Sequence, residues 1–308
     1  MFIKLKSQFS KVYFIYSMSI VVKQFDPTLA EINRAYLIIG RKGSGKSTLM
    51  FTLLGKLAPR IHYAVAMCGT RDGVEKFGRV MPADVIHNSF NPAIFSSIIK
   101  TLARNSMVSG YKTITSVILD DLAFAKGTFK SEEMRESLMN GRWLGLNLVM
   151  TQQYLMDLGP DLRGQIDYIF AMAETTKKTR QKLFDYYYGI FNTFADFERV
   201  FSAVTSKKGR ALVLDNTTTT SVISDRVFYY DGDINASSEF TIGCSTFHSH
   251  LALERIRRFD VSKGVPTSTS LNNQATRGGG TSANGRPYAN GEPAPSQEQS
   301  KNDSDLII

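Results

Sequence analysis

Cysteine is scarce in this chain: its 308 residues include only Cys68 and Cys244, which lie far apart in the sequence. Two distant cysteines do not make a disulfide framework, so we expect a reducing compartment. Long apolar runs are also missing. The apolar stretch 12–22 is shorter than the roughly 20 residues that cross a bilayer, and no small-residue cleavage site follows it. We therefore expect no signal peptide and no transmembrane helix. The stretch either packs on the core, which we favour, or contacts a membrane surface.

Negative charge is in short supply. The chain has 37 lysines and arginines against 28 aspartates and glutamates, a net charge of +9 and a pI near 9.4. From Val261 onward cations and anions balance, so the excess lies in the preceding part of the chain. An excess of this sign indicates a polyanionic partner, and nucleic acid is the partner we expect.

Branched apolar residues almost disappear after about residue 260, where Gly, Ser, Asn and Pro take over. Such a segment buries too little apolar surface to offset the entropy of ordering it, so we predict a disordered tail over 261–308. The remainder, in a chain with 43% hydrophobic residues, suffices for one large core. We assign 1–34 to an N-terminal extension and 35–260 to a single domain.

Short apolar runs alternate with helical patterns through the middle of the chain. This alternation predicts an α/β protein with a mostly parallel sheet and helices on both faces. Continuous rather than alternating apolar residues indicate strands covered on both faces. The expected strands are 36–40, 62–68, 116–120, 146–151, 168–172, 211–214 and 226–230. The expected helices are 47–57, 93–105, 131–143, 177–188 and 194–205.

One motif explains the first strand and helix. The residues from 40 to 48 read GRKGSGKST and match G-x-x-x-x-G-K-[ST], between an apolar strand and a helical pattern. In such a loop, backbone N–H groups and the positive end of the helix face phosphate oxygens. Lys46 is expected to neutralise phosphate charge and Ser47 to bind Mg²⁺. The nucleoside triphosphate, which we take to be ATP, would be held by Gly40, Arg41, Lys42, Gly43, Ser44, Gly45, Lys46, Ser47 and Thr48.

A second motif supplies acidic groups. The segment 115–122 reads TSVILDDL, an apolar strand that ends in two aspartates. Asp120 is expected to support Mg²⁺, and Asp121 to activate water as a general base. A further strand lies between the two motifs in the sequence, as in the additional-strand class of P-loop ATPases. The motif pair therefore predicts hydrolysis and not only binding.

The next strand, LNLVMTQQ, ends in Gln152 and Gln153. Ligands of open α/β sheets bind at the carboxyl ends of strands, so this strand end is expected beside the phosphates. A neutral amide there can sense the γ-phosphate or orient water, and the sequence does not distinguish the two glutamines. An ordinary polar strand exit is the alternative.

Together, GRKGSGKST, VILDDLAF, NGRWLGLNLVMTQQY and LGPDLRGQIDYIF resemble the genome-packaging ATPases of poxviruses, giant viruses and virophages, within the FtsK–HerA superfamily of P-loop ATPases. The resemblance covers about residues 35–244. It implies a RecA-like sheet, a ring-shaped homo-oligomer in the form of a hexamer, double-stranded DNA as substrate, and a capsid or vertex protein as partner. It also implies a place in the host cytoplasm, at the assembly site, or in the virion.

The resemblance further assigns the sensor role to Gln152 or Gln153 and makes Arg142 and Arg163 candidate arginine fingers. Two alternatives stay open. Arg142 can be a solvated residue at a helix C-terminus, and Arg163 can form a salt bridge with Asp167. Activity as a single-strand helicase, or as an assembly ATPase that does not translocate, also remains open.

The DNA-contacting surface is harder to place. The basic stretches 177–182 and 206–210 can hold a phosphate backbone or form solvated surfaces. A third cluster, Cys244, His248 and His250, matches no four-ligand zinc spacing, and we expect a packed helix start there.

Overall fold

The computed structural model describes residues 20–109, 113–122, 131–153, 158–233 and 240–262. The chain divides into two compact units, one that ends at His248 and one that begins at Ser249. The first unit holds the whole sheet. In the second unit the described residues, 249–262, continue the helix α8. The predicted tail, 261–308, lies almost entirely outside the described residues, as does most of the stretch 12–22.

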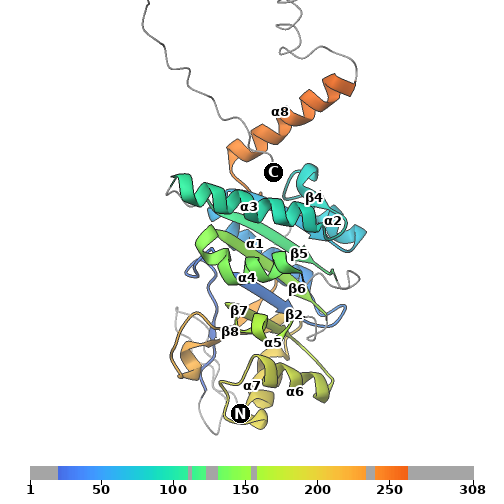
Figure 1. The fold of residues 1–308 in the computed structure, drawn as a ribbon. Coiled ribbons are helices and arrows are strands. Elements are labelled where there is room, and N and C mark those ends of the chain that lie inside the picture. The colour runs from blue at the N-terminus through green and yellow to red at the C-terminus, as the bar shows by residue number, and fades with distance from the viewer. Residues whose placement is uncertain (1–19, 110–112, 123–130, 154–157, 234–239, 263–308) are drawn as a thin grey trace, which may run out of the picture. The chain divides into compact units, whose positions relative to one another are not determined.

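Nine strands form one sheet in the order β1-β9-β8-β7-β2-β6-β5-β3-β4 (Figure 1). Only β8 runs against the others among the described strands, because its pairings with β7 and β9 are antiparallel and the rest are parallel. The strand bounds are β1 Lys23–Gln24, β2 Ala35–Ile39, β3 Tyr63–Cys68, β4 Ile86–His87, β5 Thr115–Asp120, β6 Leu146–Gln152, β7 Tyr168–Met172, β8 Arg210–Asp215 and β9 Val227–Asp231.

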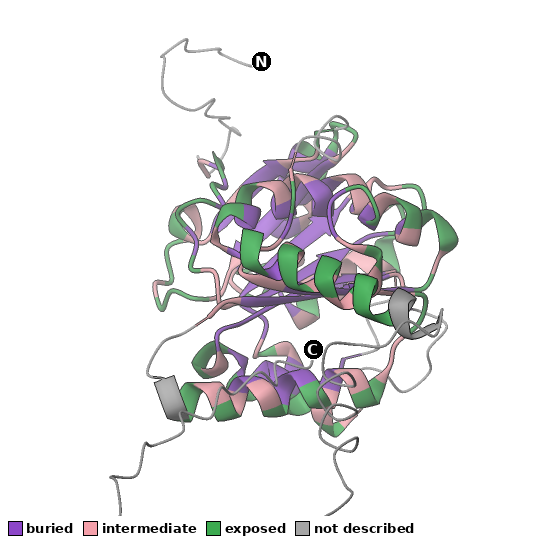
Figure 2. Ribbon diagram, turned by 90° about the horizontal axis from the view of Figure 1, so that it is seen from above, coloured by how far each residue is buried: buried purple, intermediate pink, exposed green. Residues whose placement is uncertain are grey.

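Helices cover the sheet. α1 contacts β2 and β6, α3 packs on α4, which covers β6, and α7 covers β8 beside α6. Figure 2 shows that buried residues concentrate in the strands between the helices. The helix bounds are α1 Lys46–Leu57, α2 Arg71–Phe77, α3 Pro92–Ser109, α4 Glu132–Leu144, α5 Pro160–Arg163, α6 Lys177–Tyr186, α7 Phe194–Thr205 and α8 Ser245–Ser262, with short 3₁₀ turns at Ala58–Arg60, Ala83–Val85 and Ile223–Asp225.

The predicted fold class is confirmed. Every residue of β2, β5, β6 and β7 is buried, which is why these strands read as continuous apolar runs. The strand β6 lies between the strand that precedes the phosphate-loop motif, β2, and the acid-bearing strand, β5. The strand predicted between the two motifs in the sequence, 62–68, is β3, which lies on the other side of β5 from β6.

A buried carboxylate joins the amino ends of the central strands. Asp167 directly precedes β7 and is 1% exposed. Its Oδ2 accepts the N–H of Ala35, the first residue of β2, at 2.9 Å. Its Oδ1 lies 2.5 Å from Arg142 at the end of α4 and 3.8 Å from Arg34. Burial raises the pKa of Asp167, while the Ala35 N–H and the two arginines oppose that rise. This cluster fixes β2, β7 and α4 to one another.

We predict that Asp167→Ala lowers the free energy of unfolding by about 3–5 kcal/mol, because it removes the buried carboxylate that pairs with Arg142, faces Arg34 and accepts the Ala35 N–H. Denaturant unfolding measures the change. The matched control is Asp225→Ala, which removes an exposed aspartate and should stay within about 0.5 kcal/mol of wild type. Equal stability of the two variants would contradict a structural role for Asp167.

Candidate functional site

The predicted phosphate loop connects β2 to α1. Gly43 has φ 77° and Gly45 has φ 99°, in the left-handed region that favours glycine. A Cβ on Gly43 would meet nothing within 4 Å, so this part of the loop faces open space. α1 begins at Lys46, and the Leu49 N–H donates to the Gly45 carbonyl at 2.9 Å. The N–H groups at the start of this helix have no intrahelical acceptors, so they are available to an anion.

Close packing fixes the start of the loop. The Gly40 N–H donates to the Gln152 carbonyl at 3.1 Å, which continues the β2–β6 ladder by one residue. A Cβ on Gly40 would lie 2.7 Å from both the Met172 Cβ and the Ser44 Oγ, so only glycine fits there without displacement. The Ser44 hydroxyl is buried and has no hydrogen-bond partner among the described residues.

Lys46 is held at the base of this loop. Its side chain is 8% exposed, and Nζ donates to the Arg41 carbonyl at 3.1 Å. Burial lowers the pKa of Lys46, and the charges of Asp121 and Asp120 oppose that shift. A partly desolvated ammonium close to two carboxylates has strong electrostatic interactions with any further charge.

The acid pair lies at the carboxyl end of β5. Asp120 is 3% exposed, and its Oδ1 accepts the Thr151 hydroxyl at 2.7 Å. Burial raises the pKa of Asp120, against the Thr151 hydrogen bond and the charge of Lys46. Asp121 has φ 49° and is the only non-glycine residue of the described chain with positive φ. Its N–H donates to the Thr151 hydroxyl at 2.9 Å.

Gly69 lets the chain pass close to Asp121. A Cβ at position 69 would lie 2.1 Å from the carbonyl oxygen of Asp121, a backbone atom that cannot move aside cheaply. The Gly69 N–H donates to the Asp120 carbonyl at 2.9 Å. The turn between β3 and α2 therefore supports the backbone of both acids. The sequence alone indicates no role for Gly69 or Thr151, because neither belongs to a motif with a fixed spacing.

The two glutamines have different surroundings. Gln153 is half-buried, and its Nε2 donates to Asp121 Oδ1 at 2.5 Å. Gln152 is 3% exposed, and neither of its side-chain amide atoms has a hydrogen-bond partner among the described residues. A buried amide without partners costs free energy unless a ligand satisfies it. The structure thus separates two residues that the sequence could not.

The two arginines lie away from the phosphate loop of their own chain. Arg142 pairs with Asp167 at the amino end of β7. At about 3.3 Å per residue, the length of β2 separates that end from Gly40 by roughly 16 Å. The Arg163 Nε donates to the Leu158 carbonyl at 3.0 Å, and its guanidinium lies 3.7 Å from the centroid of the Tyr186 ring. The alternative of an Arg163–Asp167 salt bridge is therefore wrong.

The basic stretch 206–210 lies beside the phosphate loop. A Cβ on Gly45 would lie 3.6 Å from the Cα of Gly209. Arg210 donates to both carboxylate oxygens of Asp231, at 2.7 and 2.9 Å, and Lys207 reaches the same group at 3.1 Å. Two of the three cations of this loop thus share one carboxylate within the fold.

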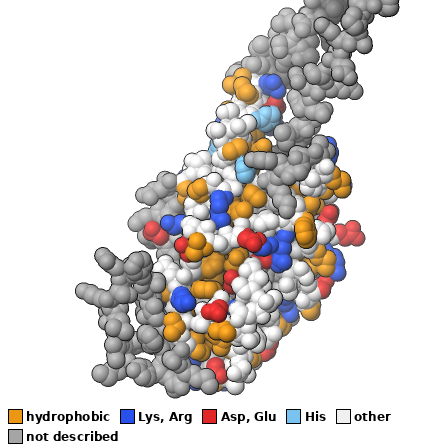
Figure 3. Space-filling view, turned by 90° about the vertical axis from the view of Figure 1, so that its left-hand side faces the viewer, with side chains coloured by type: hydrophobic (Ala, Val, Ile, Leu, Met, Phe, Trp, Pro, Cys, Tyr) orange, Lys and Arg blue, Asp and Glu red, His pale blue; other side chains and the backbone are white. Residues whose placement is uncertain are grey.

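The other basic stretch, 177–182, starts α6. Arg180 pairs with Glu198 of α7 at 2.7 Å, so it belongs to a helix–helix contact. On the face shown in Figure 3, basic and acidic side chains are interspersed over the described residues. The structure therefore gives no single basic surface, among the residues seen on this face, as the place for DNA.

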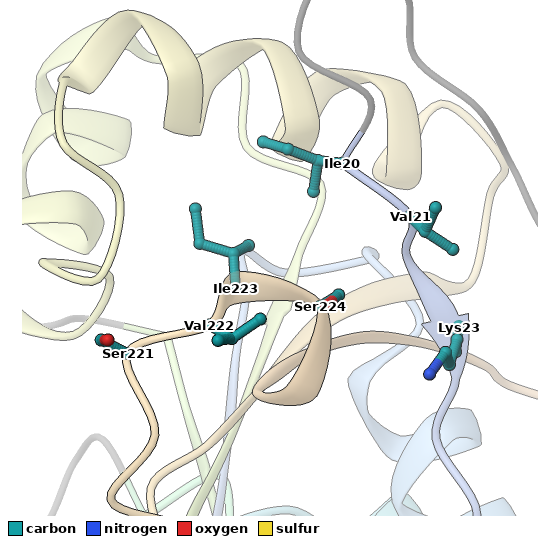
Figure 4. Close-up of a pocket in the computed structure, with 7 residues that line it drawn as sticks. All are labelled: Ile20, Val21, Lys23, Ser221, Val222, Ile223 and Ser224. Carbon is teal, nitrogen blue, oxygen red and sulfur yellow. The ribbon is translucent and has the colours of Figure 1, made fainter.

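Two further features carry no catalytic group. Among the described residues no three His, Cys, Asp or Glu side chains gather as a metal site, and His248 Nε2 instead lies 2.9 Å from the Ile242 carbonyl at the start of α8. An open pocket at the β1 edge has a mostly apolar lining of Ile20, Val21, Lys23, Ser221, Val222, Ile223 and Ser224 (Figure 4). No helix in the described part of the chain is long and apolar enough to cross a membrane.

Comparison with known proteins places the chain among viral proteins. Protein 088R of Invertebrate iridescent virus 3 is 30% identical over 217 residues, which is 69% of this chain and 82% of the relative. Protein L437 of Acanthamoeba polyphaga mimivirus is 30% identical over 241 residues, 73% of this chain and 80% of the relative. No family model matches the chain.

Among solved structures, the genome packaging NTPase B204 of Sulfolobus turreted icosahedral virus 2, in complex with AMP, has 19% identity and a TM-score of 0.49, and covers 67% of this chain and 100% of that one. A two-ATPase segment of EssC from Geobacillus thermodenitrificans has 15% identity and a TM-score of 0.42, and covers 76% of this chain and 45% of that one. Likenesses at this level do not transfer a function.

We predict that Gly69→Ala lowers the free energy of unfolding by about 1–3 kcal/mol, because the new methyl overlaps the Asp121 carbonyl. Thermal or denaturant unfolding measures it. Gly164→Ala is the matched control, since φ is −68° there and a Cβ meets nothing within 4 Å. That control should be neutral or gain up to about 1 kcal/mol. A Gly69→Ala protein as stable as the control would show that the close approach is not a constraint.

Proposed function

Because the chain belongs to the family of viral proteins that includes 088R and L437, we propose that it is an ATP-hydrolysing motor that moves double-stranded viral DNA into a preformed capsid. The observation that carries the proposal is that the phosphate loop, Lys46 and the acid pair meet at the carboxyl ends of the parallel strands β2 and β5. The motif resemblance to packaging ATPases of large DNA viruses agrees with the sources of these relatives.

The loop suits the triphosphate of ATP. The left-handed glycines Gly43 and Gly45 and the free N–H groups of α1 provide donors around an open space. Lys46 is the ammonium group that binds phosphate charge, and its partial burial strengthens that attraction. The unpartnered hydroxyl of Ser44 is a further donor that bound phosphate can satisfy. Gly40, Arg41, Lys42 and Thr48 complete the proposed nucleotide-binding segment.

The oxygen groups beside the loop fit Mg²⁺. Hard cations prefer carboxylate and hydroxyl oxygens, and Asp120 and Ser47 are the residues that would hold it. Asp120 is a buried carboxylate whose pKa burial raises, so a cation beside it offsets the cost of its ionised form. When bound, the ion neutralises charge on the β- and γ-phosphates.

Asp121 is the proposed general base. Its carboxylate accepts the proton of the attacking water, and Gln153 orients that carboxylate through their 2.5 Å hydrogen bond. Gln152 is the proposed γ-phosphate sensor, because its buried amide has both a donor and an acceptor free among the described residues. This assignment gives the two neighbouring glutamines distinct roles.

If Arg142 or Arg163 takes part in hydrolysis, we propose that it does so at the ATP site of a neighbouring subunit. Arg142 is 43% exposed on its side chain although it pairs with Asp167, and Arg163 is half-buried. In a ring, which the resemblance implies is a hexamer, one of these arginines would reach the ATP site of the next subunit as an arginine finger. Such a finger raises kcat about 10³–10⁵-fold in other phosphoryl-transfer systems. The net charge of +9 supports duplex DNA as the cargo. A capsid or vertex protein would anchor the ring, at the cytoplasmic assembly site or in the virion.

We predict that duplex DNA raises the steady-state ATPase rate more than single-stranded DNA does, measured by phosphate release with no DNA, single strands or duplex. The physical reason is that only the duplex engages all the phosphate contacts of a duplex pump. Stimulation by single strands alone would point to a helicase. Equal rates under all three conditions would contradict the packaging proposal and favour an assembly ATPase that does not translocate.

Two variants test the residues. Lys46→Ala should abolish nucleotide binding, and Asp121→Asn should retain binding but lose about 10²–10⁴ in kcat. Lys56→Ala, an exposed lysine in the last turn of the same helix, is the control for Lys46 and should leave both unchanged. Asp225→Asn is the matched control for Asp121→Asn and should leave nucleotide binding and kcat unchanged. Wild-type turnover by Asp121→Asn would refute the general-base assignment.

We also predict that Gln153→Ala lowers kcat by roughly 10-fold or more, since a hydrogen bond to a charged group contributes about 1.5–3 kcal/mol. The effect should disappear in the Asp121→Asn background, because the two residues act through one contact. Kinetics of the double-mutant cycle measure this coupling. Additive losses would mean that Gln153 does not act through Asp121.

A further inference from the structure

We propose that Thr151 is a positioning residue of the hydrolytic site, whose single hydroxyl holds Asp120 and Asp121 in their working arrangement. The inference rests on the proposed ATPase function. It gives a role to a residue of β6 that no motif singles out and that directly precedes the two glutamines.

The hydroxyl makes two hydrogen bonds of opposite sense. It donates its proton to Asp120 Oδ1 at 2.7 Å and accepts the N–H of Asp121 at 2.9 Å. A hydroxyl has one proton, so these two contacts use its donor and one of its acceptor sites. Thr151 is 2% exposed, so water does not compete for these bonds at the surface. One atom therefore links the carboxylate of one acid to the backbone of the other.

Asp121 needs such a support. It is the only described non-glycine residue with positive φ, at 49°, and a residue in that region keeps its conformation only when its surroundings hold it there. The Thr151 hydroxyl binds the N–H of Asp121 on one side. The space next to its carbonyl exists only because residue 69 is glycine. A change of φ at Asp121 would also break its contact with Gln153.

Threonine suits this position better than serine or valine, the residues closest to it in size. Its β-branch restricts χ1 on a strand, so the hydroxyl points in one direction. Serine keeps the hydroxyl but loses that restriction, and valine keeps the shape but loses the hydroxyl. Substitutions to valine and serine thus separate the hydrogen bonds from the packing.

The same pair of strands supplies a matched control. At the amino end of β5 and β6, Asn147 Nδ2 donates to the Ser116 hydroxyl at 2.9 Å, and both residues are fully buried. Ser116→Ala therefore removes a buried side-chain hydrogen bond between the same strands, at the end away from the acid pair. If Thr151 only ties strands together, the two losses should have similar consequences.

The experiment measures kcat and KM for ATP in wild type, Thr151→Val, Thr151→Ser and Ser116→Ala, together with the affinity for a non-hydrolysable ATP analogue. Thr151→Val should lose about 10-fold or more in kcat with KM and analogue affinity within roughly 3-fold, the pattern of a group that acts in the transition state. Thr151→Ser should stay within roughly 3-fold of wild-type kcat. Ser116→Ala should keep wild-type kcat even if it melts at a lower temperature.

A second readout is independent of turnover. Hydrogen exchange of the Asp121 amide, followed by NMR without nucleotide, should be faster in Thr151→Val and near wild type in Thr151→Ser. Unchanged exchange in Thr151→Val would overturn the inference. So would wild-type kcat in that variant while the wild-type protein is active, and that result would leave the ATPase proposal standing. A wild-type protein without ATPase activity would overturn both.

Discussion

The register between three parallel strands determines the whole site. β2 pairs with β6 from Ala35 to Ile39, and β6 pairs with β5 from Leu146 to Met150. Because of this register, the carboxyl ends of the three strands lie side by side, and the phosphate loop, the acid pair and the polar end of β6 meet there. A slip of one residue would turn Asp120 and Thr151 to the opposite face of the sheet. Two polar pairs between β5 and β6 oppose that slip, because it would break the hydrogen bonds of Asn147 with Ser116 and of Thr151 with Asp120.

Burial gives the groups at this edge their electrostatic character. It lowers the pKa of Lys46 and raises the pKa of Asp120, so in each case it disfavours the charged form. The mutual attraction of the opposite charges compensates in part. A magnesium–triphosphate complex brings both signs of charge to such a site, a cation to the carboxylate and an anion to the ammonium. Binding of the magnesium–triphosphate complex would therefore offset the free-energy cost of burying the charged forms of Lys46 and Asp120.

Much of this could be predicted from the sequence, since the strands that carry the motifs are uniform apolar runs that end in glycine, acid or amide residues. The β7 and α7 bounds were predicted to the residue. The two-residue strands β1 and β4 and the short helices α2 and α5 were missed, because so few residues show no periodicity. The pairing of Arg142 with Asp167 and the bridge through Thr151 depend on residues about 25 to 30 positions apart in the sequence. The packing of α4 brings the first pair together, and the register of β5 with β6 brings the second.

The central claim is that hydrolysis at this edge moves duplex DNA, and a triplex-displacement assay tests it directly. In this assay a translocating protein strips a short third strand from a duplex, and the released strand is followed by fluorescence. The account predicts ATP-dependent release by the wild-type protein and none by Asp121→Asn, which still binds nucleotide. Hydrolysis of ATP by the wild-type protein on the same duplex, without release of the third strand, would contradict it.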